Sequence, residues 1–154
     1  MKLLNKNAFI TGGSSGIGAA IATLFAKEGA NISFCHYNDD SKANHIIKTI
    51  NQFSKKNFAM NIDIGSKKNC ENFYEQSIKE IGQPDILVNN AGIIFARPFE
   101  EATEEEFDKT INVHLKSTFF LSQLCYQSMK EKKYGRIINI SSQLVFSGGP
   151  NRTD

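Results

Sequence analysis

The chain has 154 residues, of which 40% are hydrophobic and 22% are charged, as is typical of a soluble globular domain. Its 18 basic and 16 acidic residues are scattered and leave a net charge of +2, so we expect no nucleic-acid partner. No apolar run approaches the roughly 20 residues that span a bilayer, and no secretory signal precedes the first strand, so we expect no membrane partner and a cytoplasmic location.

Short apolar runs alternate with amphipathic stretches along the chain. The apolar runs predict buried strands, and the amphipathic stretches predict helices because their apolar residues recur on one face. The predicted strands are Asn7–Thr11, Asn31–His36, Phe58–Ile62, Asp85–Val88 and Arg136–Ile140. The predicted helices are Gly16–Lys27, one that opens at Ser41, one that Ser66 caps, and a long one that begins at a Thr103–Glu106 capping box and ends near Lys132.

Strands that alternate with helices indicate a parallel sheet covered on both faces. Right-handed crossovers then favour an α/β fold with a Rossmann-like, doubly wound sheet. No internal repeat, low-complexity segment or linker divides the chain, so residues 1–154 are predicted to form a single domain.

The three cysteines and three histidines are not grouped. Cys35, Cys70 and Cys125 are far apart and form no Cys-x-x-Cys pair, so we expect reduced thiols that pack in the interior. The histidines do not lie at ligand spacing from them, and the sequence therefore predicts no metal site.

A glycine-rich turn, TGGSSGIG, joins the first predicted strand to the first predicted helix. Glycines at Gly12, Gly16 and Gly18 would let the backbone turn tightly and approach a phosphate, and the positive end of the helix favours an anion. This context predicts a site for the pyrophosphate of a dinucleotide. The alternative is a plain tight turn between a strand and a helix.

Four motifs in the same order resemble the short-chain dehydrogenase/reductase family. The turn Thr11–Gly18 matches the TGxxxGxG pattern of that family, and the NNAG stretch Asn89–Gly92 follows the fourth strand as it does there. Asn112 within INVHLKSTFF matches the family's active-site Asn, and Ser142 within GRIINISS matches its catalytic Ser. The chain is most similar to members of the 3-oxoacyl-acyl-carrier-protein reductase and glucose dehydrogenase types.

The resemblance implies an NAD(P)-binding domain. The glycine turn would shape the pyrophosphate loop with serine hydroxyls at hand, Asp63 would bind the adenine amino group, and NNAG would line the adenosine ribose side. The implied cofactor-binding residues are Gly12, Ser14, Ser15, Gly16, Ile17, Gly18, Tyr37, Asn38, Asp63, Asn89, Asn90, Ala91 and Gly92. The structural alternatives are a turn or helix-capping role for Asp63 and a structural turn for NNAG.

Two residues take catalytic roles by resemblance. Ser142 would donate a hydrogen bond to the carbonyl oxygen of a ketone substrate, and Asn112 would hold a water in a proton relay. The alternative for Ser142 is a strand-end hydroxyl that satisfies loop backbone. His114 is expected to be a partly buried helix residue without a role in the site.

Cofactor choice depends on the end of the second strand. The position where NAD enzymes carry a carboxylate for the ribose 2′-hydroxyl is Tyr37, followed by Asn38, and neither is acidic. Asp39 and Asp40 come shortly after. Ser15 stands where NADP enzymes often have Arg, so basic residues for a 2′-phosphate are missing too. The balance favours NADP(H) over NAD(H).

The family's chemistry also needs a Tyr-x-x-x-Lys pair, in which Lys lowers the pKa of the proton-donating Tyr. The family places that Tyr about a dozen residues after the position of Ser142, which is where this sequence stops. The one literal match, Tyr126–Lys130, precedes Ser142 and lies far along the long helix, so we interpret it as a surface pair. We therefore expect the N-terminal part of a longer reductase.

Alone, residues 1–154 are expected to be marginally folded and inactive, with an apolar edge strand that carries Ile137, Ile138 and Ile140. The full-length protein would be a homo-oligomer, a dimer or tetramer, that acts on a small carbonyl or alcohol substrate. Two alternatives remain open: a dinucleotide-binding module without catalysis, and a remnant that neither folds nor binds.

Overall fold

The computed structural model describes residues 1–54 and 56–149, so residue 55 and the last five residues of the predicted domain lie outside it. Five strands form one sheet: β1 (Asn7–Thr11), β2 (Asn31–His36), β3 (Asn57–Asn61), β4 (Ile86–Asn89) and β5 (Arg136–Asn139). The α-helices are α1 (Gly16–Lys27), α2 (Asp40–Ile50), α3 (Lys67–Ile81), α4 (Glu104–Ile111), α5 (Ser117–Lys132) and the short α6 (Leu144–Ser147).

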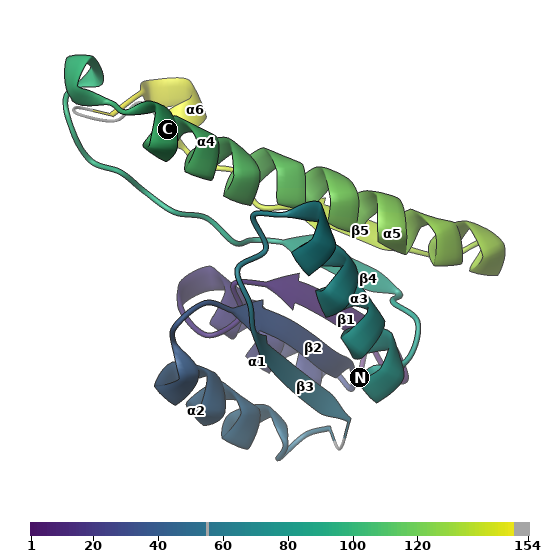
Figure 1. Cartoon of the computed structure of the whole chain (residues 1–154). Helices are drawn as coiled ribbons and strands as arrows, with labels where there is room; N and C mark the ends of the chain where they lie inside the picture. Colours follow the sequence, from purple (N-terminus) through teal and green to yellow (C-terminus); the bar gives the residue numbers. More distant parts are fainter. Residues whose placement is uncertain (55, 150–154) are drawn as a thin grey trace.

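The sheet is parallel throughout, in the order β3-β2-β1-β4-β5, which confirms the Rossmann-like prediction (Figure 1). The strand order reverses between β1 and β4. In open sheets of this kind ligands bind at the carboxyl ends of the strands beside such a reversal. The end of β1, where the glycine turn begins, is therefore the place to look for a site.

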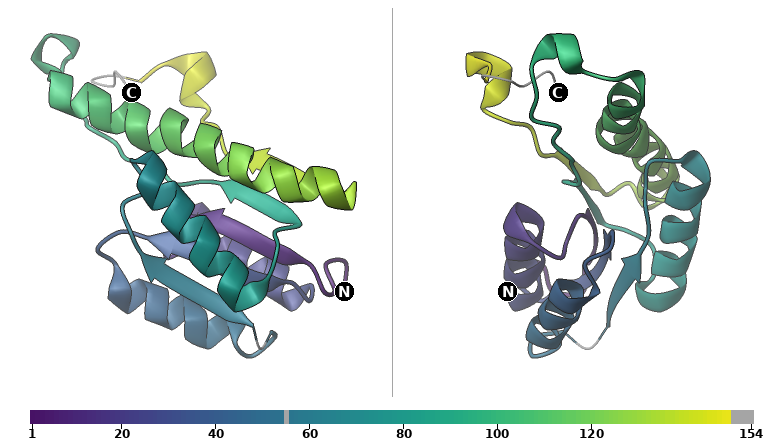
Figure 2. Two further views of the ribbon diagram at one scale, coloured as in Figure 1. Left: turned by 45° about the vertical axis from the view of Figure 1, so that its right-hand side comes forward. Right: turned by 60° about the vertical axis from the view of Figure 1, so that its left-hand side comes forward.

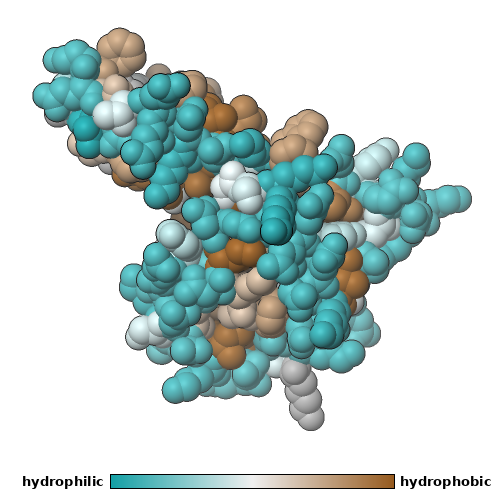
Figure 3. Space-filling model, viewed as in Figure 1, coloured by the Kyte–Doolittle hydropathy of each residue, from teal (hydrophilic) through white to brown (hydrophobic). Residues whose placement is uncertain are grey.

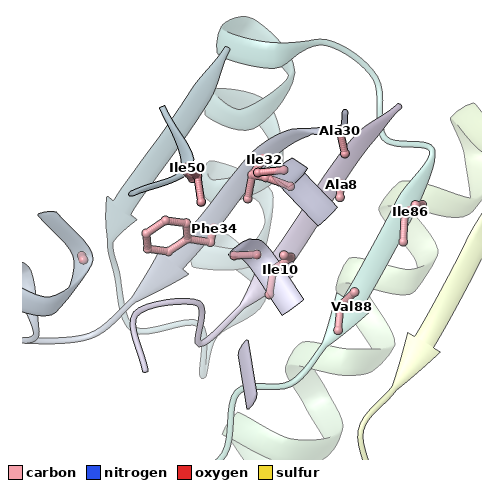
Figure 4. Close-up of a cluster of buried hydrophobic side chains, with 11 residues drawn as sticks. Ala8, Ile10, Ala30, Ile32, Phe34, Ile50, Ile86 and Val88 are labelled. Atoms are coloured by element: carbon pink, nitrogen blue, oxygen red, sulfur yellow. The ribbon is translucent and has the colours of Figure 1, made fainter. Parts of the chain in front are cut away.

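Helices cover the two faces of the sheet in pairs, with α1 and α2 on one face and α3 and α5 on the other (Figure 2). Alternation along β1 supplies both cores, since Ala8 and Ile10 pack beneath α1 and α2 while Phe9 packs beneath α3 and α5. Figure 4 shows the first cluster, in which Ile32 and Phe34 of β2 join Ile10.

The long predicted helix is interrupted in the structure. Its Thr103–Glu106 capping box is present, but a five-residue π turn, η2 (Asn112–Lys116), separates α4 from α5. The hydroxyls of Ser117 and Thr118 donate to the carbonyl oxygens of Val113 and His114 in this turn. Such side-chain bonds satisfy carbonyls inside a distorted helix.

Most other boundaries agree with the sequence to within one residue. Strand β4 begins at Ile86 rather than Asp85, since Ile86 pairs with Ala8 while the Asp85 carboxylate accepts the N–H of Asn7 at 3.0 Å. The 3₁₀ turn η1 (Phe99–Glu101) and helix α6 were not expected from the sequence. Among the helices of the described residues, none is both long and apolar enough to cross a membrane.

Strand β5 is the outermost strand on its side of the sheet, as expected. Each of its residues is exposed, and Ile137 and Ile138 each keep 39% of their surface accessible. The space-filling view shows a mostly hydrophilic face with separate hydrophobic patches (Figure 3).

Candidate functional site

The glycine turn follows β1 directly and leads into α1. Gly12 and Gly16 adopt left-handed φ angles of +67° and +52°, a conformation that costs other residues about 1–2 kcal/mol. A Cβ on Gly18 would lie 2.1 Å from the carbonyl oxygen of Gly12, so no side chain fits there. The Ser15 side chain makes no capping hydrogen bond, which leaves the first N–H groups of α1 to another partner.

The NNAG stretch braces this turn. The Thr11 hydroxyl accepts the backbone N–H groups of Asn90 and Ala91, both at 2.9 Å. The Asn90 amide in turn donates to the carbonyl oxygens of Thr11 at 3.0 Å and Gly12 at 3.1 Å. These bonds tie the end of β4 to the start of the glycine turn. Thr11 was missed as a site residue, although its place at the end of β1 before a glycine pair was a usable signal.

Asn89 has a bracing role of its own. Its side-chain N–H₂ donates to Asn139 Oδ1 on β5 at 2.9 Å and to Ser122 Oγ on α5 at 3.2 Å. It therefore connects β4 with its neighbouring strand and covering helix. The structural interpretation of NNAG and the binding interpretation are compatible here.

A cavity of about 240 Å³ opens at the carboxyl ends of β1, β2 and β3. Seven of the predicted cofactor residues line it, together with eight others that the sequence did not single out as binding residues. The predicted residues brought together are Gly12, Ser14, Ser15, Tyr37, Asp63, Ala91 and Gly92. The predicted residues outside this lining are Gly16, Ile17, Gly18, Asn38, Asn89 and Asn90.

Asp39 also lines this cavity, although the sequence analysis assigned it no role. It is the N-cap residue of α2, and its carboxylate accepts a hydrogen bond from the Ser14 hydroxyl. The ammonium of Lys42 lies 3.3 Å from the same carboxylate oxygen. The negative charge of Asp39, partly compensated by the positive charge of Lys42, thus lies beside the glycine turn.

His36 is a buried wall residue of the cavity. Its Nδ1 finds no hydrogen-bond partner among the described residues, and its Nε2 lies 3.8 Å from Asp40 Oδ1. Burial lowers the pKa of this imidazole, and the carboxylates of Asp40 and Asp39 oppose that shift. Nδ1 is therefore a buried polar atom whose hydrogen-bonding capacity is unused among the described residues.

Tyr37 and Asn38 follow at the end of β2. Tyr37 is exposed at the rim of the cavity. Asn38 adopts a left-handed φ of +52°, and its N–H donates to Asn61 Oδ1 at 3.1 Å. The backbone turn at Asn38 leads the chain from β2 into α2, where Asp39 and Lys42 meet Ser14.

Asp63 makes the turn contact that was its structural alternative, and its adenine-binding role stays a prediction. Its Oδ1 accepts the N–H of Gly65 at 2.9 Å, which is a local turn contact. The residue also lines the 240 Å³ cavity and a second cavity of about 610 Å³ between α3 and α4. It therefore stands at the boundary of both spaces.

The two predicted catalytic residues do not line the 240 Å³ cavity. Asn112 begins the π turn, lines the larger cavity with Asp63, and its Oδ1 accepts a hydrogen bond from Lys116. Ser142 is exposed, and its Oγ accepts the N–H of Leu144 at 3.1 Å, the loop-satisfying contact considered as its alternative.

His114 differs from expectation. It is exposed rather than partly buried, and its Nε2 contacts the backbone of Ile93, a residue in the wall of the 240 Å³ cavity. The Tyr126–Lys130 match to Tyr-x-x-x-Lys lies on the surface, as expected, since both residues are exposed on α5.

Within residues 1–54 and 56–149, no group of three or more potential metal ligands is assembled.

The residues at this edge of the sheet fit the phosphates and ribose of a dinucleotide. The turn at Gly12 and Gly18 is a cradle that a Cβ would fill, and it faces the uncapped N-terminus of α1. Ser14 and Ser15 line the adjoining cavity and bring hydroxyls to it, and His36 forms part of its wall.

Comparison with known proteins agrees with this geometry. The model of the short chain dehydrogenase family matches residues 6–153. The (2S)-[(R)-hydroxy(phenyl)methyl]succinyl-CoA dehydrogenase subunit BbsD of Thauera aromatica is 37% identical over 99% of this chain and 61% of its own length. The 3-oxoacyl-[acyl-carrier-protein] reductase FabG of Rickettsia prowazekii is 35% identical over 99% of this chain and 60% of its own.

A solved structure is equally similar. The blue fluorescent protein from a metagenomic library, in complex with NADPH, superposes with a TM-score of 0.90 at 35% identity, over 99% of this chain and 62% of that one. The chain thus spans about 60% of the length of the curated relatives named above. From the family match, these likenesses and the motifs at the carboxyl edge of its sheet, the chain belongs to the short-chain dehydrogenase/reductase family.

Proposed function

We propose that the full-length protein is an NAD(P)-dependent oxidoreductase that transfers hydride between a nicotinamide cofactor and a ketone or secondary alcohol. The observation that carries this proposal is the braced glycine turn, which Thr11 and Asn90 hold open beside the 240 Å³ cavity. A bound nicotinamide dinucleotide would supply the hydride chemistry. The chain's own residues would bind its phosphates at Gly12 to Gly18 and its adenosine between Tyr37, Asp63 and Ala91.

NADP(H) is the proposed cofactor. No acid occupies position 37, and the similar metagenomic protein was solved with NADPH. Two observations favour NAD(H): Ser15 stands in place of a basic residue, and the Asp39 carboxylate beside the glycine turn would repel a 2′-phosphate. Lys42 lies 3.3 Å from that carboxylate and offsets its charge.

The substrate is proposed to be a small carbonyl compound or alcohol, with 3-oxoacyl-acyl-carrier-protein as a specific candidate because of the likeness to FabG. In that reaction Ser142 would donate a hydrogen bond to the substrate's carbonyl oxygen, and Asn112 would hold a relay water. No tyrosine follows Ser142 in the 154 residues, so we propose that this chain binds dinucleotide without reducing ketones.

A dinucleotide-binding module without catalysis is the second candidate. It is supported by the loop contact of Ser142, whose Oγ accepts the N–H of Leu144 at 3.1 Å, because that contact gives the residue a structural role whether or not its hydroxyl also donates to a substrate. Turnover by the full-length protein would decide against this candidate.

The full-length protein is proposed to be a cytoplasmic homo-oligomer, a dimer or tetramer. Along α4, η2 and α5 an exposed apolar row offers a surface for association, and its members are Phe107, Ile111, Leu115, Phe119 and Tyr126. The three cysteines are free and buried, as suits a reducing compartment. Sedimentation analysis of the full-length protein would measure the oligomeric state.

The experiment that tests the function is a titration of the purified chain with NADPH and NADH, followed by fluorescence. We expect saturable binding, and Gly18→Ala is expected to abolish it. The full-length protein would then be assayed for NADPH oxidation with a 3-oxoacyl thioester. Absence of binding by a folded chain would refute the proposal.

A further inference from the structure

His114 makes a contact that neither its sequence context nor the proposed mechanism accounts for. The residue lies in the π turn η2, and its Nε2 is 3.0 Å from the backbone N and 2.9 Å from the backbone O of Ile93. The two residues are 21 positions apart in the sequence. Because the imidazole is exposed, burial in the core does not explain where it lies.

The ring also packs against Gly92. A Cβ on that glycine would lie 2.7 Å from His114 Cε1 and 3.4 Å from Nδ1, so glycine is required for the imidazole to fit. Ala91, Gly92 and Ile93 form one wall of the 240 Å³ cavity. His114 does not line that cavity itself, and therefore supports the wall from outside.

A single ring nitrogen faces both a donor and an acceptor of the same residue. Without a proton, Nε2 accepts the N–H of Ile93; with a proton, it donates to the Ile93 carbonyl oxygen. It makes one of these bonds at a time, and either of them holds the backbone of Ile93. The π turn that carries the histidine is itself held, because Thr118 Oγ1 donates to the His114 carbonyl oxygen at 2.7 Å.

The wall is anchored at its other end by the glycine turn. Ala91 N–H donates to Thr11 Oγ1 at 2.9 Å, so the segment from Ala91 to Ile93 runs between an anchor on β1 and an anchor on η2. The chain continues from there into a segment without regular structure up to residue 95. Loss of the second anchor would free this end of the wall to move.

We propose that His114 is a positioning residue that holds the wall Ala91–Ile93 in place for dinucleotide binding. The inference rests on the proposed cofactor site for its functional consequence. Its structural part, the hold of the imidazole nitrogen on Ile93, stands on the contacts alone.

The test compares two substitutions of His114 that distinguish the effect of the hydrogen-bonding nitrogen from the effect of the ring's shape. In His114→Gln the side-chain amide reaches about as far as Nε2 and offers both a donor and an acceptor. In His114→Phe the ring remains and the nitrogen is lost. His45→Phe, at an exposed position on α2, is the matched control.

Two readouts are measured on the 154-residue chain: the Kd for NADPH, and amide hydrogen exchange at Ile93. We expect His114→Phe to raise the Kd about fivefold, the ratio that corresponds to one neutral hydrogen bond, and to speed exchange at Ile93. His114→Gln is expected to stay within about twofold of the unsubstituted chain in both readouts, as is the His45→Phe control.

Equal behaviour of the Phe and Gln variants in both readouts would overturn the proposal, because a role of ring shape or helix packing does not depend on the nitrogen. If the unsubstituted chain bound no NADPH, the proposed function would fail. Hydrogen exchange at Ile93 would still test whether His114 holds Ile93 in place. Faster exchange in the Phe variant but not in the Gln variant would support that contact, and unchanged exchange in the Phe variant would refute it.

Discussion

The hydroxyl of Ser14 donates a hydrogen bond to the carboxylate of Asp39, with 3.2 Å between Oγ and Oδ2. This bond joins the glycine turn to the first residue before α2, across the carboxyl ends of β1 and β2. The acid at the cavity is therefore Asp39, the N-cap residue of α2. It lies two positions after Tyr37, the strand-end position at which the sequence has no acidic residue. We therefore propose that Asp39, a residue beyond the strand, influences cofactor preference.

Asp39→Asn is expected to shift the preference of the chain toward NADPH. Removal of one negative charge near a 2′-phosphate eliminates a repulsion of about 1 kcal/mol at 4 Å in water, which corresponds to about fivefold in relative affinity. The ratio of the Kd for NADH to the Kd for NADPH, measured by fluorescence titration, should rise by about that factor. Asp40→Asn removes a neighbouring charge whose residue does not line the cavity and serves as the control. An unchanged ratio in the Asp39 variant would show that this carboxylate does not face the phosphate.

The two glycines of α1's first turn should respond differently to substitution by alanine. On Gly18 a Cβ would lie 2.1 Å from the Gly12 carbonyl oxygen, so the glycine turn must shift. On Gly16 a Cβ would meet nothing within 4 Å, and the cost is that of its φ of +52°. We expect Gly18→Ala to lower the free energy of unfolding by about 3 kcal/mol and Gly16→Ala by about 1 kcal/mol.

Urea unfolding followed by circular dichroism measures both changes. Equal destabilisation by the two substitutions would contradict the steric argument, because only Gly18 faces the backbone of the turn. NADPH titration of the same variants would show whether the loss of stability and the loss of binding go together.

The periodic elements of this fold could be predicted from the sequence because each is encoded locally. The short apolar run of β1 and the capping serine of α3 appear within a few residues of the chain, and the structure contains both. The parallel order of the strands followed from general rules of topology. The sequence did not reveal the π turn at Asn112–Lys116, since these residues include no Gly or Pro that would mark a break in the helix.

The site could be predicted only in part, for a related reason. The glycine turn and NNAG are contiguous motifs, and the structure brings them together through Thr11 and Asn90. Asp39 and His114 contact partners 25 and 21 residues away, so these contacts depend on how the folded chain places α2 and the π turn. A single Asp or His in a sequence does not indicate which distant residue it will contact in the fold.

A lysine on the outer strand is expected to reduce association of the chain. Strand β5 presents Ile138 with 39% of its surface exposed at the edge of the sheet, and an apolar edge invites pairing with another chain. Ile138→Lys should lower the average mass seen by sedimentation at high protein concentration. Leu24→Lys, which replaces an exposed apolar residue of α1 away from the edge, is the control. A similar decrease in both variants would assign the effect to net charge rather than to the edge.

The buried thiols should make stability fall at alkaline pH. Burial raises the pKa of Cys35 and of Cys125 from 9.0 to about 12 each. Between those values the unfolded chain has lost protons that the folded chain keeps, so the folded state binds more protons and the free energy of unfolding decreases as pH rises. Each thiol contributes a slope of about −1.4 kcal/mol per pH unit within this window, and nothing below it.

Cys125→Ala tests this assignment, because it removes one thiol from the core cluster beneath α3 and α5. Urea unfolding at several pH values between 8 and 11 should show a shallower decline for this variant than for the unsubstituted chain. Met129→Ala opens a cavity in the same cluster without removing a titratable group, so its curve should be displaced downward and keep the original slope. If Cys125→Ala also kept that slope, the alkaline loss of stability would have to come from groups other than this thiol.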